Sequence, residues 1–136
     1  MANLQPYLDN LKHISDEKIT SAAIYCQDGS PRARSESFPA VTDDQIRAIV
    51  EGFDNMNVLA ANGLWLGNEK FIVIRGEPGS VIRGRNKENL NGKSDGCCIH
   101  KTGDGIVIGI YGETSAAGGV TISVATVAKY LKDVGF

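Results

Sequence analysis

Apolar residues recur along the chain at helix spacing near both ends and in the middle. Near the N-terminus, the apolar positions i, i+3, i+4 and i+7 are occupied by Leu4, Tyr7, Leu8 and Leu11. Between about residues 118 and 132, one helix face collects Val120, Val124, Val127, Ala128 and Leu131. Because residues at these intervals share a face of an α-helix, we expect an amphipathic helix at each end of the chain.

The middle helix has the clearest start signal. Thr42 is followed three residues later by Gln45, which is the spacing of a capping box. Asp43 and Asp44 favour the positive N-terminal end of the helix dipole. A buried stripe follows, made of Ile46, Ile49, Val50 and Phe53. We therefore expect a third helix to begin after Thr42.

Between the helices, the chain has segments with the residue pattern of β-strands. Seven strands are predicted, over residues 19–26, 32–35, 63–66, 70–75, 81–85, 96–101 and 106–111. Tight glycine-containing turns join most of them, so the sheet is expected to be antiparallel. Residues 71–74 and 106–110 are apolar on both faces, which requires helices on both sides. The fold class is therefore α/β (α+β), with the terminal helices on one face and the middle helix on the other. Periodicity alone equally allows other small α/β sandwiches.

Length and composition narrow the class of protein. A chain of 136 residues with 42% hydrophobic residues fits one domain, residues 1–136. No apolar run approaches the roughly 20 residues of a membrane helix, and the first residues lack a secretory signal pattern. Three cysteines, an odd number, include the adjacent pair Cys97 and Cys98. We therefore expect a cytoplasmic protein with free thiols and no transmembrane segment.

Charge is distributed unevenly along the chain. The net charge is −2, but residues 70–101 hold seven basic and three acidic residues, a local charge of +4 that leaves −6 elsewhere. The small net charge implies no dominant nucleic-acid or membrane field, and the basic middle favours one face suited to an acidic partner or to lipid phosphates. Solvated lysines that protect hairpin edges remain an alternative reading.

Motifs for catalysis or metal binding are weak. Gly92-Lys93-Ser94 resembles the end of a phosphate-binding loop, but Lys87 occupies the position of the required first glycine. Cys98 and His100 share one strand face, yet a catalytic pair needs an orienting group and a metal needs more ligands. We expect no enzyme activity, cofactor or metal. A small hydrolase dependent on Cys98 or His100 is the competing enzyme hypothesis.

Several segments together point to a known family. The run from Asn62 to Glu77, followed by Ser80-Val81-Ile82-Arg83-Gly84, has two arginines at neighbouring strand ends. An opening amphipathic helix, Gln27-Asp28-Gly29-Ser30 after a strand, Lys101-Thr102 before a glycine-rich strand and a closing helix with Tyr130-Leu131 complete the pattern. Nearly the whole chain thus resembles profilin. The resemblance implies a profilin fold that binds and sequesters or delivers monomeric actin. A non-actin interaction scaffold is the alternative.

The resemblance implies an actin-facing surface on the central hairpins and the start of the last helix. Its counterparts here are Ala60, Ala61, Lys70, Ile72, Ile74, Arg75, Arg83, Arg85, Gly118 and Thr121. Thr121 replaces the asparagine of the family, and Ile122 and Ser123 replace charged residues. An apolar patch fringed by cations suits an acidic, partly apolar partner.

A second implied site binds proline-rich peptides between the terminal helices. Its counterparts are Leu4, Tyr7, Asn10, Ser30, Arg32, Tyr130 and Phe136. Leu4 and Arg32 replace the two tryptophans of the family, so we expect weak, altered or absent binding of proline-rich proteins. Trp65 is expected outside this groove, as a partly exposed sheet residue.

A third implied property is phosphoinositide binding. It would use Arg75, Arg83, Arg85, Lys87 and Lys93. Two of these lie in the segment from Asn86 to Ser94, which is longer than the tight turn that is usual for the family and is rich in Asn, Lys and Gly. If actin and lipid use the same arginines, their binding is expected to be mutually exclusive.

Overall fold

The computed structural model describes residues 4–15, 18–77, 79–86, 96–112 and 117–136, apart from the side chains of Arg75 and Ala117. Its helices are α1 (Gln5–Ile14), α2 (Asp43–Gly52), α3 (Met56–Asn62) and α4 (Ala117–Asp133). Its strands are β1 (Ile19–Cys26), β2 (Pro31–Arg34), β3 (Leu64–Leu66), β4 (Glu69–Glu77), β5 (Val81–Arg85), β6 (Gly96–Lys101) and β7 (Gly105–Tyr111). The described strands match the seven expected ones to within two residues at each end.

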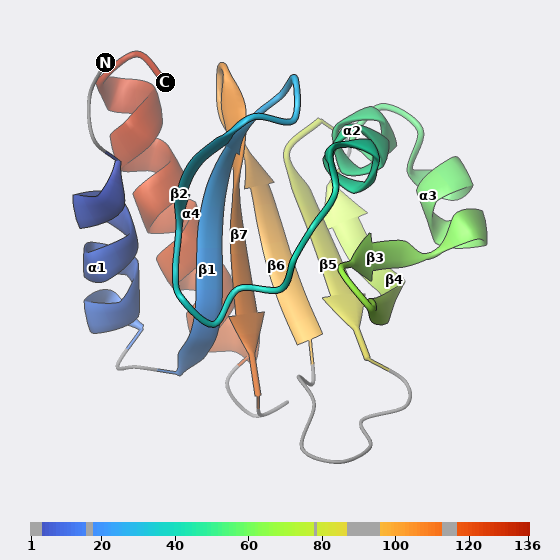
Figure 1. The fold of residues 1–136 in the computed structure, drawn as a ribbon, viewed down its shortest axis with the longest axis horizontal. Coiled ribbons are helices and arrows are strands. Elements are labelled where there is room, and N and C mark those ends of the chain that lie inside the picture. The colour runs from blue at the N-terminus through green and yellow to red at the C-terminus, as the bar shows by residue number, and fades with distance from the viewer. Residues whose placement is uncertain (1–3, 16–17, 78, 87–95, 113–116) are drawn as a thin grey trace.

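The strands form one curled antiparallel sheet. Their order is β2-β1-β7-β6-β5-β4-β3, and every pairing between neighbours is antiparallel (Figure 1). The consecutive strands β3, β4, β5, β6 and β7 are neighbours in space, whereas β1 joins the sheet beside β7. The expected antiparallel arrangement is confirmed.

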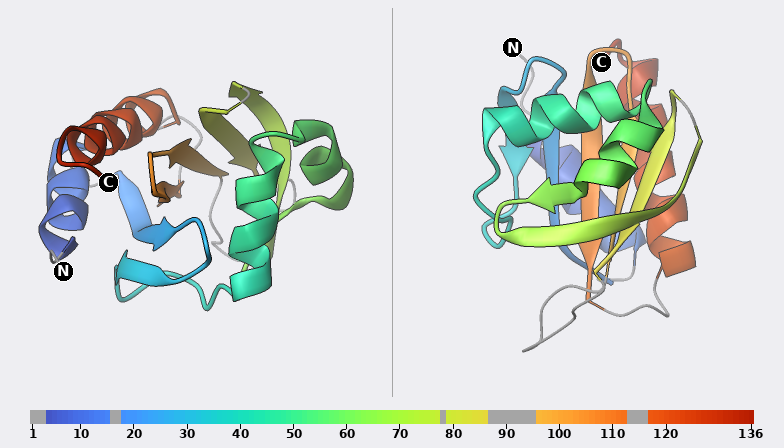
Figure 2. Two further views of the ribbon diagram at one scale, coloured as in Figure 1. Left: turned by 90° about the horizontal axis from the view of Figure 1, so that it is seen from above. Right: turned by 90° about the vertical axis from the view of Figure 1, so that its right-hand side faces the viewer.

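Helices cover both faces of the sheet. The terminal helices α1 and α4 lie together on one face, and α2 and α3 lie on the other (Figure 2). Each face has its own apolar core, and alternate residues of one strand enter different cores. In β6, Cys98 packs on the terminal-helix side, while Cys97 and Ile99 pack on the α2 side. The predicted two-sided burial of the sheet is therefore confirmed.

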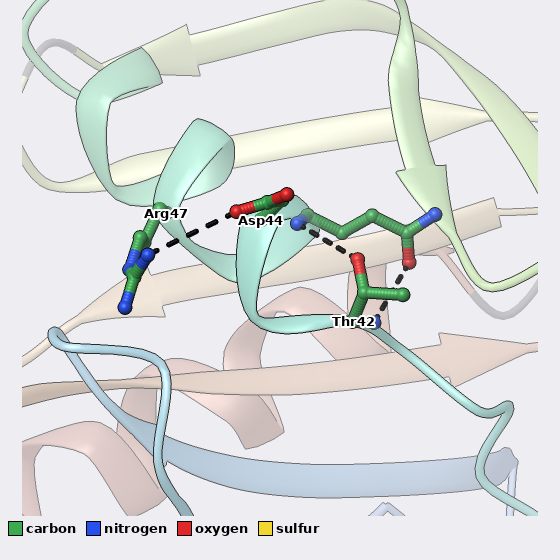
Figure 3. A network of polar contacts seen from close by, with 4 residues as sticks. Thr42, Asp44 and Arg47 are labelled. Carbon is green, nitrogen blue, oxygen red and sulfur yellow. Dashed lines mark hydrogen bonds and ion pairs between the residues drawn. The ribbon is translucent and has the colours of Figure 1, made fainter.

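The start of α2 also fixes the adjacent hairpin. The Thr42 hydroxyl accepts from the Gln45 N–H, and the Gln45 side chain accepts from the Thr42 N–H, both at 3.2 Å (Figure 3). The Gln45 amide also donates to the Gly67 carbonyl and accepts from the Gly67 N–H at 3.0 Å. Gly67 has a φ of 65°, which suits glycine in the turn between β3 and β4. The predicted capping box thus ties α2 to this hairpin.

Helix α3 has no counterpart in the sequence prediction. It spans seven residues, has Asn55 at its N-cap without a side-chain cap hydrogen bond, and buries only Leu59 among its residues. A helix with a single buried position produces no apolar stripe, so hydrophobic periodicity cannot reveal it. Its packing against α2 is close, because a Cβ added to Gly52 would lie 2.6 Å from Leu59 Cδ2. The short helix is therefore held by tertiary contact.

Candidate functional site

One side of the sheet is only partly covered by helices. Helix α4 packs on β6 and β7, and the same side of β4 and β5 is left accessible. On β4, Ile72 is 41% exposed and Ile74 is 51% exposed, whereas Phe71 between Lys70 and Ile72 is buried. We call this surface the open sheet face and define it by Trp65, Lys70, Ile72, Ile74, Arg83 and Arg85. It contains five of the residues predicted to face actin.

Strand register places the cations of the open sheet face beside its apolar side chains. Ile72 pairs with Arg85 across the antiparallel ladder, and Arg83 lies two residues earlier on the same side of β5. Arg85 is exposed and Arg83 is half-buried. Ile74 is the extra residue of a β-bulge between Val73 and Arg75, where the register shifts. The apolar patch fringed by cations that the sequence predicted is therefore present on this surface.

Trp65 belongs to this surface, although the sequence prediction assigned it no role. It pairs with Lys70 on the neighbouring strand, and Lys70 Nζ lies 5.8 Å from the centroid of its ring. The side chain is 42% exposed, as expected for a partly exposed sheet residue. The two-residue turn at Gly67 and Asn68 fixes this pairing, so the hairpin signal in the sequence was sufficient to find it.

The start of α4 adjoins the open sheet face through Cys98. Cys98 pairs with Arg83 in the sheet, and its thiol is hydrogen-bonded to the Thr121 side chain. Burial raises the pKa of Cys98 to about 11, and the Thr121 hydrogen bond and the Arg83 charge offset part of that rise. Thr121 is half-buried, and Gly118 one turn earlier is exposed. The contact with Cys98 places Thr121, another of the predicted actin-facing residues, against β6.

Further residues implied by the resemblance lie at the start of α4 and on α3, outside the open sheet face. Ile122, next to Thr121, is 70% exposed, whereas Ser123 is buried and its hydroxyl donates to the Gly119 carbonyl at 2.9 Å. Ala60 and Ala61 are exposed on α3, which packs at the β4 end of the sheet. The charged family positions at 122 and 123 have therefore become one exposed apolar and one buried polar side chain.

The features proposed for hydrolase chemistry are unsuited to it. The raised pKa of Cys98 keeps its thiol protonated at neutral pH, and a thiol must lose its proton to act as a nucleophile. Burial is also the main cause of the lowered pKa of His100, to which Lys132 contributes. His100 Nε2 is buried without a hydrogen-bond partner within the described part of the chain. In the same residues, no group of three potential metal-binding side chains occurs.

Some of the residues predicted to bind proline-rich peptides lie together between the terminal helices. Three predicted residues, Tyr7, Asn10 and Tyr130, line a cavity of about 400 Å³ between α1 and the end of α4. The lining also includes Pro6, Asp133 and Val134, which the sequence prediction did not include. We call this cavity the terminal-helix groove. Tyr130 is 44% exposed there, so an aromatic surface is accessible to a ligand.

Leu4 differs from its predicted place in this site. It is only 3% exposed and packs in the core with Leu8 and Leu131. Burial of the Leu4 side chain is favourable because it removes apolar surface from water. Leu4 therefore supports the groove from beneath and does not line its surface.

Arg32 and Phe136 form a pair beside the terminal helices. Arg32 is the extra residue of a β-bulge in β2, where Ala33 pairs with Ile24 but Pro31 pairs with Tyr25. Its guanidinium carbon lies 5.8 Å from the centroid of the Phe136 ring. The arginine that replaces a family tryptophan therefore lies against a ring that was itself predicted to contact proline-rich ligands.

Ser30 is held within the turn between β1 and β2. Its hydroxyl donates to Asp28 Oδ1 at 2.6 Å, and its backbone N–H donates to the same oxygen at 2.9 Å. These two hydrogen bonds lower the pKa of the Asp28 carboxyl. Neither Ser30 nor Arg32 lines the terminal-helix groove as described. The predicted proline-binding residues are thus divided between that groove and the β2 side of the molecule.

The predicted phosphoinositide residues are described only in part. Arg83 and Arg85 lie on the open sheet face. Lys87, Lys93 and the segment from residue 87 to 94 lie outside the described residues, as does the side chain of Arg75. In the described part of the chain, no helix is long and apolar enough to cross a membrane.

A curled antiparallel sheet with terminal helices on one face and a short helix pair on the other defines an α+β protein of the profilin class. The family model described as profilin matches residues 2–136. The chain therefore belongs to the profilin family, whose members are non-enzymatic actin-binding proteins.

Solved profilin structures resemble the chain over almost its full length. Profilin II of Acanthamoeba castellanii is 29% identical, with a TM-score of 0.82 and coverage of 97% of this chain and 98% of its own. Mouse profilin IIa, in complex with a double repeat from the FH1 domain of mDia1, is 29% identical, with a TM-score of 0.76 and coverage of 99% and 100%. LokiProfilin1, in complex with rabbit actin, is 18% identical, with a TM-score of 0.69 and coverage of 95% and 93%, and shows similarity of fold alone.

Proposed function

We propose that residues 1–136 act as one cytoplasmic, cytoskeleton-associated domain that binds monomeric actin reversibly through the open sheet face. The observation that carries this proposal is the register of β4 and β5, which sets Arg85 beside the exposed Ile72. Membership of the profilin family supports it, and one structural neighbour was solved in complex with rabbit actin.

The proposed mechanism is steric. Arginines offer planar, bidentate hydrogen bonds to carboxylates, and the isoleucines between them supply apolar contact area. A bound protein would cover one surface of the actin monomer that is needed for assembly and would release the monomer unchanged. This mechanism regulates actin polymerisation by sequestration or delivery, without any bond-making step.

Calorimetry of the reduced protein with monomeric actin tests this proposal. We expect saturable one-to-one binding that weakens as salt rises, because salt screens exposed charges. Arg85→Glu reverses a charge at the proposed interface and is expected to weaken binding about tenfold, which corresponds to about 1.4 kcal/mol. Arg34→Glu is the matched control, since Arg34 is also the exposed last residue of a strand but lies in β2.

Two results would contradict the actin proposal. Equal weakening by Arg85→Glu and Arg34→Glu would show that overall charge, and not the open sheet face, controls affinity. Absence of binding at about 100 μM actin, which corresponds to less than about 5.5 kcal/mol of binding free energy, by a protein with a cooperative unfolding transition would favour the non-actin scaffold.

We further propose that the terminal-helix groove binds proline-rich peptides weakly. Its support is the exposed Tyr130 beside Tyr7, since aromatic rings stack on polyproline II ligands. The neighbour that carries a double repeat from an FH1 domain adds to this support. The groove offers tyrosines only, without the indole N–H donors of tryptophan. Titration with a decaproline peptide, followed by NMR of the tyrosine ring protons, tests it; absence of shifts in Tyr7 and Tyr130 would contradict it.

Phosphoinositide binding is proposed at the same arginines. Arg83 and Arg85 lie two residues apart on one side of β5, and each basic group contributes about 1 kcal/mol near an anionic membrane. We expect vesicles containing phosphatidylinositol bisphosphate to compete with actin. Simultaneous binding of vesicles and actin would show that the two ligands use different surfaces.

A further inference from the structure

Two adjoining hollows lie between α2 and α3, on the opposite side of the sheet from α4. Their volumes are about 340 and 160 Å³, and both are lined by Ala48, Leu59, Asn62 and Gly63. Because they share these lining residues, the two hollows adjoin each other, and together we call them the α2–α3 groove. Figures 1 and 2 show the two helices side by side, with β3 at one end. The groove shares Trp65 with the open sheet face, and its other lining residues belong to none of the surfaces proposed above.

The groove has an apolar floor and an acidic rim. Ile49 and Leu59 are buried at its base, and Trp65, 42% exposed, lines one end. Asp44 lines the hollow that contains Trp65, and Glu51 lines the other hollow. Among the described residues that line the groove, none carries a positive charge. Its electrostatic character is therefore opposite to that of the open sheet face.

Neighbouring cations leave the rim accessible. Arg47 Nη1 lies 3.8 Å from Asp44 Oδ1, but the two side chains are 60% and 95% exposed, so their interaction is weak (Figure 3). Lys70 lies over the Trp65 ring without lining either hollow. A cation from another molecule can therefore approach Asp44 from solvent.

The spacing of the two carboxylates indicates the form of a ligand. Asp44 and Glu51 are seven residues apart on α2, which corresponds to about 10.5 Å along the helix axis. In an extended polyproline II chain, residues three apart lie on the same side and are separated by about 9.3 Å. Two basic side chains at this interval match the two carboxylates. An arginine stem or an adjacent apolar side chain then rests on the apolar floor and on the ring of Trp65.

From this geometry we propose that the α2–α3 groove binds a basic peptide segment of a partner protein, with two Lys or Arg residues three positions apart and an apolar residue between them. The acidic rim supplies the charge complementarity, and Leu59 with Trp65 supplies the apolar contact. The proposal does not rest on the proposed binding of actin, although Trp65 belongs to both surfaces.

The sole tryptophan of the chain makes the test direct. Trp65 lines the groove, so its fluorescence reports occupancy without a label. The probe is the capped peptide acetyl-Gly-Arg-Ala-Leu-Arg-Gly-amide, titrated into the protein in the absence of actin. We expect a saturable change with a dissociation constant of about 0.1 to 1 mM. The same composition with adjacent arginines, acetyl-Gly-Arg-Arg-Ala-Leu-Gly-amide, is expected to bind more weakly.

Two double variants that remove the same charge distinguish an effect of the groove from an effect of the net charge of the protein. The double variant Asp44→Asn, Glu51→Gln is expected to bind the peptide more weakly. Its dissociation constant should rise about two- to thirtyfold, which is the range expected for loss of two exposed ion pairs. Asp43→Asn with Asp54→Asn removes the same charge from exposed residues that do not line the groove, and should leave binding unchanged. Thermal unfolding checks that both variants are folded.

The proposal is overturned if the fluorescence of Trp65 does not change up to about 10 mM peptide, well above the expected dissociation constant. It is also overturned if the two double variants lose affinity equally, or if both peptides bind equally well. Because Arg85 lies outside the groove, Arg85→Glu should retain peptide binding. Peptide binding by a protein that fails to bind actin supports this inference while refuting the proposed function.

Discussion

The open sheet face and the terminal-helix groove are assembled from the chain in different ways. The sheet residues of the open face lie within residues 64–85, on three consecutive strands joined by short turns. The groove combines the first helix with the last residues of α4, more than a hundred positions apart in the sequence. Strand register therefore determines the first surface, whereas the second depends on how two distant helices pack.

This difference explains which predicted residues changed place. On the open face, Ile72 and Ile74 of β4 are both exposed, Ile74 as the extra residue of a β-bulge. At the groove, helix packing buried Leu4, and a β-bulge placed Arg32 against Phe136. The structure thus keeps the residues assigned from strand register together on one surface, and it divides the residues assigned across the helix–helix contact.

The largest expected effect is on the free energy of unfolding, and it distinguishes the buried Leu4 from a surface residue. Leu4→Ala removes a buried side chain and should destabilise the protein by about 2–5 kcal/mol, because it loses transfer free energy and leaves a cavity. Ile72→Ala, on the open sheet face, should cost less than about 1 kcal/mol. Urea unfolding of both variants measures the difference. Equal costs would mean that Leu4 is not part of the core.

The next effect concerns the thiol beneath the open sheet face. Burial raises the pKa of Cys98 to about 11 from the ordinary value of 9.0. At neutral pH its thiolate fraction is then about 100-fold lower than that of an ordinary cysteine. Labelling of Cys98 should therefore be at least that much slower, and its rate should keep rising with pH up to about 11.

A Cys97→Ala variant allows this measurement with an internal reference. The half-buried Cys26 then serves as the reference thiol in the same molecule. Peptide mass spectrometry after timed alkylation gives both rates. Similar rates for Cys26 and Cys98 in the folded protein at neutral pH would contradict the predicted protection.

The smallest expected effect comes from restoring an aromatic side chain at position 32, beside Phe136. Arg32→Trp should tighten the binding of a decaproline peptide about two- to twelvefold, because an aromatic pair with Phe136 adds stacking surface. Actin binding should stay unchanged, since Arg32 lies outside the open sheet face. Arg34→Trp is the control on the same strand. Equal tightening by both variants would indicate a nonspecific aromatic effect.

Much of the fold was predictable because its signals are local. The Thr42–Gln45 capping box and the buried positions Ile46, Ile49 and Phe53 were identified from spacing alone, and the structure contains all of them. Helix α3 escaped prediction because it buries only one of its own residues. Trp65 was expected to be a partly exposed sheet residue, and the two-residue turn after Leu66 pairs it with Lys70.

The sequence by itself determined the strands, the three amphipathic helices, the family resemblance and the basic character of residues 70–101. These features follow from backbone geometry, which repeats every two residues in a strand and every 3.6 in a helix. Only the tertiary structure decided the burial of Leu4, the contact of Arg32 with Phe136 and the groove between α2 and α3. These depend on side chains from separate elements competing for the same space, and no repeat along the chain encodes that outcome.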